Sequence, residues 1–181
     1  MGRKNKSRIA WHYCYDNHIN EILESAKLLP PCEVNTLNSP EETDEMRNSK
    51  DYMSDKRLLL FSENAVWEPA SYRSKTFWSA TVPYMDIPLL KLEDYAKYEV
   101  GVYRIGVSTK HLKPYSQLCR EVHMPVAMDA GLIVVARKIG GNPFQWWGST
   151  KPVPQEKWVA IQKYVDGVWV DMFDENGEAV A

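Results

Sequence analysis

The alternation of apolar and polar positions divides the chain into short strands and helices. Residues 8–13 read as a strand that leads into a helix, and Asp16 stands where its side-chain oxygen can cap the free amides of the first turn. Four apolar residues then recur at helical spacing: Ile19, Ile22, Leu23 and Ala26. The helix is expected to stop before Pro30-Pro31, because proline cannot continue it.

The clearest local signal is a hairpin near the end of the chain. Residues 158–165 and 168–173 are rich in branched and aromatic side chains, and Asp166-Gly167 between them suits a tight type I′ turn. Further strands are predicted at 58–62 and 100–107, together with a buried strand at 132–136, and helices at 89–98 and 115–122. The number of strands favours an α+β class with mainly antiparallel pairing.

Composition fits one domain that spans residues 1–181, with a basic tail at 1–8 and a polar insert at 33–57. The formal net charge of -2 disfavours a general nucleic-acid binder. No stretch is apolar for long enough to span a bilayer, so no membrane partner and a cytoplasmic location are expected. The three cysteines form no Cys-x-x-Cys pair, and no metal site is predicted, although His12 and Cys14 share one side of a strand.

Three separated segments carry candidate chemistry. Trp11-His12-Tyr13 places a histidine where a strand meets a helix, and rigid backbone on both sides suits a ligand-binding group. Leu58 to Ser62 runs into Trp67-Glu68-Pro69 and Tyr72. An acid beside an aromatic ring there suits a pocket, and Trp67 equally suits a hydrophobic anchor for the loop. The third segment, 155–161, places Glu156 at the entrance of the hairpin's first strand.

Together these segments resemble the ADP-ribosyltransferases of the His-Tyr-Glu branch, which includes the poly(ADP-ribose) polymerases and diphtheria-type toxins. The resemblance implies that His12 holds the adenosine ribose of NAD, that Ser62 contacts the nicotinamide and that Tyr72 stacks on its ring. Glu156 corresponds to the catalytic glutamate beside the nicotinamide ribose. The implied fold has two packed, mainly antiparallel sheets around a central cleft, with short flanking helices.

The resemblance implies NAD as the substrate, with Glu156 and His12 as catalytic residues. The residues expected to bind the dinucleotide are His12, Tyr13, Ser62, Trp67 and Tyr72. Cleavage of the nicotinamide–ribose bond passes through an oxocarbenium-like state, which a fixed carboxylate stabilises. The acceptor of the ADP-ribose is open: a protein, a nucleic acid, a small molecule or water. An autonomous effector of phage or toxin type is one origin that suits this size.

Each candidate also has a structural interpretation. On position alone, Glu156 reads as a solvated charge, Ser62 as a strand-end hydroxyl and Tyr72 as a tyrosine on the core. Trp146 and Trp147 are expected either to contact a partner or to close the core. Two other functions stay open: an RNA 2′-phosphotransferase-like enzyme, and a non-catalytic interaction module on the same fold.

Overall fold

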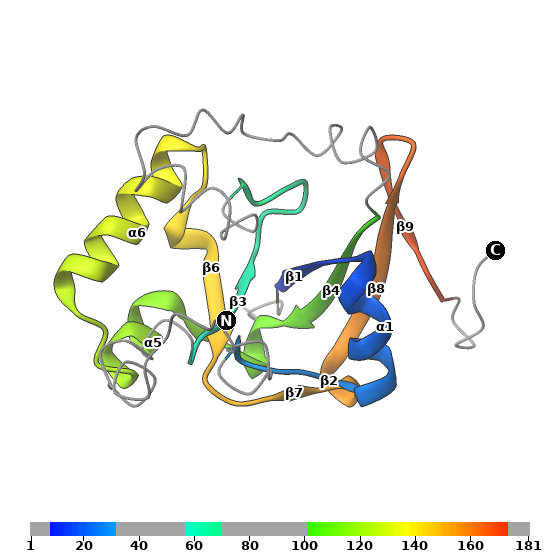
Figure 1. The fold of residues 1–181 in the computed structure, drawn as a ribbon, viewed down its shortest axis with the longest axis horizontal. Coiled ribbons are helices and arrows are strands. Elements are labelled where there is room, and N and C mark those ends of the chain that lie inside the picture. The colour runs from blue at the N-terminus through cyan, green and yellow to red at the C-terminus, as the bar shows by residue number, and fades with distance from the viewer. Residues whose placement is uncertain (1–7, 32–56, 70–100, 174–181) are drawn as a thin grey trace, which may run out of the picture.

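A computed structural model describes residues 8–31, 57–69 and 101–173 of the chain (Figure 1). Its strands are β1 (Ile9–Tyr15), β2 (Lys27–Leu28), β3 (Leu59–Ser62), β4 (Val102–Ser108), β5 (Lys113–Pro114), β6 (Trp146–Ser149), β7 (Val153–Pro154), β8 (Trp158–Val165) and β9 (Val168–Asp171). The α-helices are α1 (Asp16–Ser25), α5 (Tyr115–Glu121) and α6 (Val126–Lys138). One-turn 3₁₀ helices cover Thr109–His111, Pro143–Gln145 and Gln155–Lys157.

The strands form a seven-stranded sheet in the order β5-β6-β3-β1-β4-β8-β9 and a two-stranded sheet of β2 and β7. Every strand pair in the described residues is antiparallel. The α+β class and the antiparallel pairing expected from the sequence are therefore confirmed. The strand–helix start, the strand at 58–62, the strand near 100–107 and the helix near 115–122 also form as predicted.

The register of β1 decides which side chains share a face of the large sheet. Trp11 lies opposite Ser62 of β3 and Gly106 of β4, and Tyr13 lies opposite Arg104. Because paired residues point to the same side and successive residues alternate, Trp11, Tyr13, Ser62 and Arg104 share one face. We call it the Arg104 face.

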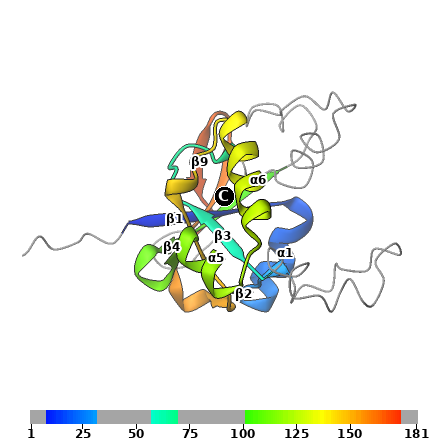
Figure 2. The same cartoon turned by 90° about the vertical axis from the view of Figure 1, so that its left-hand side faces the viewer.

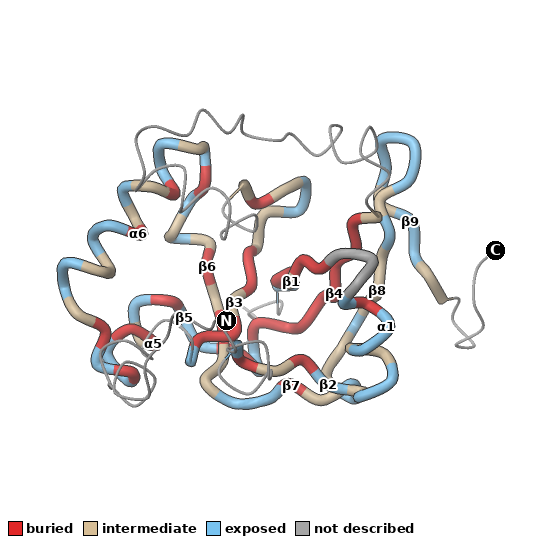
Figure 3. Tube along the Cα trace, viewed as in Figure 1, coloured by how far each residue is buried: buried red, intermediate tan, exposed pale blue. Residues whose placement is uncertain are grey.

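The opposite face, which carries Ala10, His12 and Cys14, is covered by α1 and the small sheet, and we call it the α1 face. Its core joins residues of β1, β3 and β4 to α1, β2 and β7: Ala10, Cys14, Ile19, Leu28, Leu59, Phe61, Tyr103, Ile105, Val107, Leu112 and Val153. All seven residues of β4 are buried, so this strand is covered on both sides (Figure 3).

Helices α5 and α6 lie at the end of the sheet formed by β5 and β6, away from α1 (Figures 1 and 2). A second core cluster joins them to the sheet: Leu58, Tyr115, Leu118, Cys119, Val122, Met124, Leu132, Ala136 and Trp146. Leu118 approaches Gly148, which pairs with Leu60 on the Arg104 face. These helices therefore cover the part of the Arg104 face that lies over β6. Residues outside these helices cover the part over β1, β4, β8 and β9.

The predicted hairpin forms with both turn residues in the left-handed region, Asp166 at φ 48° and Gly167 at φ 88°. This is the conformation that a type I′ turn requires. The second strand ends at Asp171, earlier than predicted.

The prediction of a buried strand at 132–136 is wrong, because these residues lie inside helix α6. Only Leu132 and Ala136 of the segment are buried, at the i, i+4 spacing of a helix, while Val134 is 52% exposed. A short apolar run contains no polar residues that would show whether its period is that of a strand or of a helix. The length of the run does not distinguish a buried strand from a buried helix segment either.

The helix predicted at 89–98 lies outside the described residues, as do residues 1–7 of the tail and 33–56 of the insert. Within the part of the chain that the structure describes, no helix has the length and apolar character needed to span a membrane.

The close approach of β6 to β3 gives a stability prediction. A Cβ at Gly148 would lie 2.4 Å from the carbonyl oxygen of Leu59 and 2.9 Å from Leu118 Cδ1, so Gly148→Ala is expected to destabilise the fold by about 1–3 kcal/mol. Gly131 in α6 has nothing within 4 Å, and Gly131→Ala is expected to stabilise by about 0.5–1 kcal/mol. Urea unfolding of both variants measures this. Equal stability of the two variants would contradict the described packing.

Candidate functional site

A buried arginine lies on the Arg104 face, in the part of the sheet that the described helices do not cover. The Arg104 guanidinium carbon lies 3.9 Å from the ring centre of Trp11 and 4.1 Å from that of Trp169. Its Nε donates to Oε1 of Gln162 at 2.7 Å, and a terminal nitrogen donates to the carbonyl of Ala65 at 2.6 Å. Arg104 is only 5% exposed, so two indole rings and neutral oxygens take the place of water around its charge. Burial lowers the pKa of Arg104, and the carboxylate of Asp171, which accepts from Nε2 of Gln162 at 2.9 Å, acts in the opposite direction.

Tyr13 lies beside this arginine and meets two tryptophans. Its ring centre is 5.0 Å from that of Trp67, in an edge-on arrangement, and 5.9 Å from that of Trp169. Its hydroxyl donates to the carbonyl of Asn64 at 3.1 Å. Burial raises the pKa of Tyr13 to about 12, although the nearby charge of Arg104 acts in the opposite direction. The phenol is therefore neutral at physiological pH.

The loop after β3, residues 63–69, folds over Tyr13 and Arg104. Oδ1 of Asn64 accepts from the amides of Val66 at 3.0 Å and Trp67 at 3.3 Å, which is the local turn that asparagine favours. Trp169 Nε1 of the hairpin donates to the carbonyl of Val66 at 2.9 Å. Contacts from two sides thus hold the loop on the sheet.

Glu68 at the end of this loop is the only buried residue among the Asp and Glu residues whose side chains the structure describes. Ser62 Oγ donates to its Oε2 at 2.9 Å, and the same hydroxyl accepts from the amide of Asn64 at 3.1 Å. Gly141, in the turn after α6, leaves room for the carboxylate, because a Cβ there would lie 2.6 Å from Glu68 Oε1. The carboxylate is thus bonded to Ser62 through Oε2, and Gly141 packs closely against Oε1.

The Arg104 site therefore consists of Tyr13, Ser62, Trp67, Glu68 and Arg104. Three of these, Tyr13, Ser62 and Trp67, are residues that the sequence predicts to bind the dinucleotide. The sequence predicts that Glu68 lines a pocket and assigns it no catalytic role. Arg104 was missed, although a charge in the middle of the apolar run from Val102 to Val107 is a readable signal.

His12 lies on the other side of the sheet from this site. It alternates with Trp11 and Tyr13 along β1 and lies opposite Ile105 of β4, on the α1 face. Its Nδ1–H donates to the carbonyl of Leu60 at 2.9 Å, and its ring centre is 5.5 Å from that of Phe61. Burial lowers the pKa of His12 below its usual value of 6.5, so the neutral form is favoured. The structure does not bring His12 and Ser62 together.

Glu156 is exposed on the one-turn helix Gln155–Lys157, between β7 and β8. The amide of Gln155 donates to the carbonyl of Ala26 at 2.9 Å, so this helix lies against the turn between α1 and β2. Strand β8 is separated from β1 by β4, which places two strand spacings, about 10 Å, between them. Glu156 is therefore adjacent neither to His12 nor to the Arg104 site. Tyr72 lies outside the described residues.

The two tryptophans proposed as a partner contact lie on β6 and point to opposite faces. Trp146 is 8% exposed and meets Tyr115 of α5 edge-on at 5.2 Å between ring centres. Trp147 is partly buried against the core of the α1 face, with the Arg8 guanidinium 5.7 Å from its ring centre. The large exposed ring nearby is Phe144, which is 86% exposed.

His12 and Cys14 do share the α1 face, as the sequence predicts. Burial raises the pKa of Cys14 to about 12, so its thiol is protonated at physiological pH. In the described ranges, no group of three or more His, Cys, Asp or Glu side chains is placed to hold a metal ion.

Comparison of the chain with family models, with curated proteins and with solved structures finds no match.

The stacked arginine gives a prediction that separates planar stacking from charge alone. Arg104→Lys keeps the positive charge but loses the flat ring contacts and the forked donors, so we expect a loss of about 1–3 kcal/mol in the free energy of unfolding. Arg120→Lys on the exposed surface of α5 is the matched control and should change it by less than about 0.5 kcal/mol. Chemical unfolding followed by tryptophan fluorescence tests both. Equal effects would show that stacking contributes nothing.

His12 gives a prediction for the pH dependence of stability. Its lowered pKa stabilises the fold fully above pH 6.5, and that contribution is lost as the pH falls through the lower folded-state value. His12→Asn, whose amide can keep the bond to Leu60, is expected to lose less stability than the wild type between pH 7.5 and pH 5. Urea midpoints at the two pH values measure it, with exposed His18→Asn as the control. Identical acid losses in the wild type and His12→Asn would contradict the assignment.

Proposed function

We propose that this protein is an NAD-dependent ADP-ribosyltransferase-like enzyme that cleaves the nicotinamide–ribose bond, and that it binds NAD at the Arg104 site. The observation that carries the proposal is the convergence of Tyr13 of β1 with Ser62 and Trp67 of the segment at 58–69, beside a buried carboxylate. The acceptor of the ADP-ribose is a protein, a nucleic acid, a small molecule or water.

In this proposal the large and small antiparallel sheets correspond to the two packed sheets of the ADP-ribosyltransferase fold. The small sheet closes the core of the α1 face through Leu28 and Val153. The ligand then occupies the Arg104 face, on the other side of the large sheet. This location differs from a cleft that contains His12.

Glu68 is the carboxylate best suited to the chemistry. Positive charge develops on the ribose as the bond to nicotinamide breaks, and a preorganised carboxylate away from water stabilises that charge more strongly than a solvated one. Glu68 is 4% exposed and fixed by Ser62 at 2.9 Å, whereas Glu156 is exposed. The sequence resemblance alone points to Glu156, so the two carboxylates define alternative versions of the proposal.

The remaining residues of the site have positioning and binding roles. The partly buried indole of Trp67 offers a flat surface for the nicotinamide ring. Arg104 holds Tyr13 and the loop at 63–69 in place, and its positive charge favours an anionic dinucleotide nearby.

Release of nicotinamide from NAD tests the proposal. With Glu68→Gln we expect the rate to fall by about a hundredfold or more, because the amide keeps the size of the side chain but not its charge. With Glu156→Gln we expect less than a tenfold change. Thermal unfolding of each variant checks that it is folded, and Trp67→Ala should weaken NAD binding in calorimetry.

A large loss with Glu156→Gln and none with Glu68→Gln would move the chemistry to the other carboxylate and overturn the Arg104 site. Equal background release from both variants and the wild type would count against NAD cleavage as a whole. Transfer of phosphate from a 2′-phosphorylated RNA would then support the phosphotransferase alternative. A folded protein that does not bind NAD or act on that RNA would support the interaction module.

A further inference from the structure

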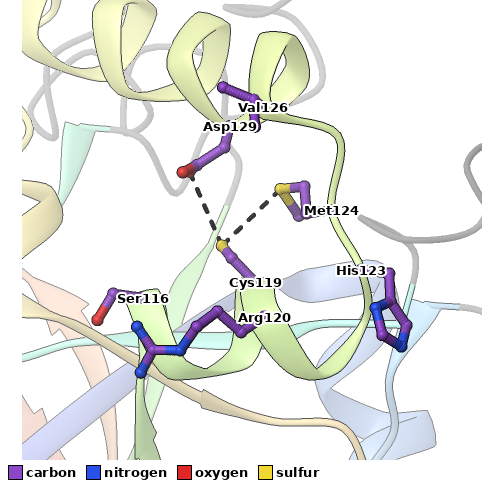
Figure 4. A pocket seen from close by; sticks show the side chains of 7 residues that line it. All are labelled: Ser116, Cys119, Arg120, His123, Met124, Val126 and Asp129. Atoms are coloured by element: carbon purple, nitrogen blue, oxygen red, sulfur yellow. Dashed lines mark hydrogen bonds between the residues drawn. The ribbon is translucent and has the colours of Figure 1, made fainter.

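A second cluster of reactive side chains lies where α5 turns back into α6, away from the Arg104 site. The chain reverses at His123, which has φ 53°, and the amide of Met124 donates to the carbonyl of Cys119 at 2.9 Å. The reversal places Met124 over Cys119 of α5, and Asp129 in the first turn of α6 faces them (Figure 4).

Two sulfur atoms and a carboxylate meet in this cluster. Cys119 Sγ lies 3.8 Å from Met124 Sδ and 3.8 Å from Asp129 Oδ1. Cys119 and Met124 are 8% and 9% exposed, yet both line an open pocket of about 500 Å³. Both residues therefore border open space, while Met124 Sδ also accepts from the Tyr115 hydroxyl at 3.7 Å.

We propose that Cys119, Met124 and Asp129 form a binding site for a soft monovalent metal ion, Cu(I). Thiolate and thioether sulfur are the donors that select Cu(I) over harder cations. With metal–sulfur bonds of about 2.3 Å, the separation of 3.8 Å between the sulfur atoms gives an angle of about 110° at the metal. A metal–oxygen bond of about 2.1 Å to Asp129 likewise gives an angle of about 120° between oxygen and Sγ.

Two other side chains that line the pocket, those of His123 and Arg120, do not point at the sulfur atoms. His123 lies on the far side of the turn with its ring directed away from the sulfur atoms, and Arg120 points toward Ser116 (Figure 4). In the part of the chain that the structure describes, no three His, Cys, Asp or Glu side chains are grouped as zinc would require. The thioether of Met124 is thus what distinguishes this site.

Binding is a simple exchange. The S–H bond of Cys119 breaks, its proton leaves to solvent, and the thiolate donates an electron pair to Cu(I). Met124 donates a sulfur lone pair and stays neutral. The thiolate neutralises the charge of Cu(I), so the complete site, with the carboxylate of Asp129 as its third ligand, carries one net negative charge. The metal keeps its oxidation state, so no oxidant or reductant takes part in the step.

Competition with a chromogenic Cu(I) chelator, under anaerobic conditions and with the full chain, tests the proposal. All proteins carry Cys32→Ser, because the structure does not describe that third thiol. We expect one Cu(I) per chain, at least tenfold weaker binding in Met124→Leu and at least hundredfold weaker binding in Cys119→Ser. Cys14→Ser, which removes a thiol buried at 4% exposure on the α1 face, should change the affinity less than twofold.

Unchanged affinity in Met124→Leu would mean that a single thiol binds the metal, and this result would overturn the proposal. A loss of binding in Cys14→Ser alone would place the metal at Cys14 and would also overturn it. X-ray absorption of the copper-loaded Cys32→Ser protein does not depend on the folding of the Met124 or Cys119 variants. Two sulfur neighbours at the metal are expected there, and one sulfur neighbour would contradict the site. Preference for Zn(II) over Cu(I) would also contradict it.

Discussion

The burial of one guanidinium between two indole rings organises the Arg104 face of this protein. Arg104 comes from β4, Trp11 from β1 and Trp169 from β9, so the stack joins strands across most of the sheet. A buried charge is costly unless its surroundings replace water, and here ring faces, an amide oxygen and a backbone carbonyl do so. The carbonyl belongs to Ala65, and therefore the loop that carries Trp67 and Glu68 is positioned by the same arginine.

The period of two along β1 explains why the predicted site divides between two faces. Trp11 and Tyr13 point to one side of the sheet and His12 points to the other, because successive side chains of a strand alternate between the two faces. His12 is partly buried on the α1 face, where it bonds to Leu60 and where burial favours its neutral form. The groups on the Arg104 face are instead arranged around the guanidinium of Arg104, and the Glu68 carboxylate beside them is bonded to Ser62. The same alternation separates Trp146 from Trp147 on β6.

Much of the architecture was predictable because the signals were local. The strand–helix start, the hairpin at Asp166-Gly167 and the antiparallel α+β class follow from short-range patterns, and each is confirmed. The segment 132–136 was not predictable in this way, since a run of apolar residues lacks the contrast that reveals a helical period. Its identity as a helix depends on packing against α5 and the sheet.

The site was only partly predictable, because strand register and long-range packing cannot be derived from the sequence of a single segment. The sequence predicts Tyr13, Ser62 and Trp67 as binding residues, a role that stays a prediction, and the pairing of Trp11 with Ser62 is what brings Tyr13 and Ser62 to one face. Arg104 and Glu68 gain their importance from neighbours distant in sequence.

An NMR titration with NAD tests most directly whether the ligand binds on the Arg104 face. The account predicts that the indole N–H resonances of Trp67 and Trp169 shift in a saturable way while the His12 ring resonances stay unchanged. Shifts at His12 with none at Trp67 would contradict it.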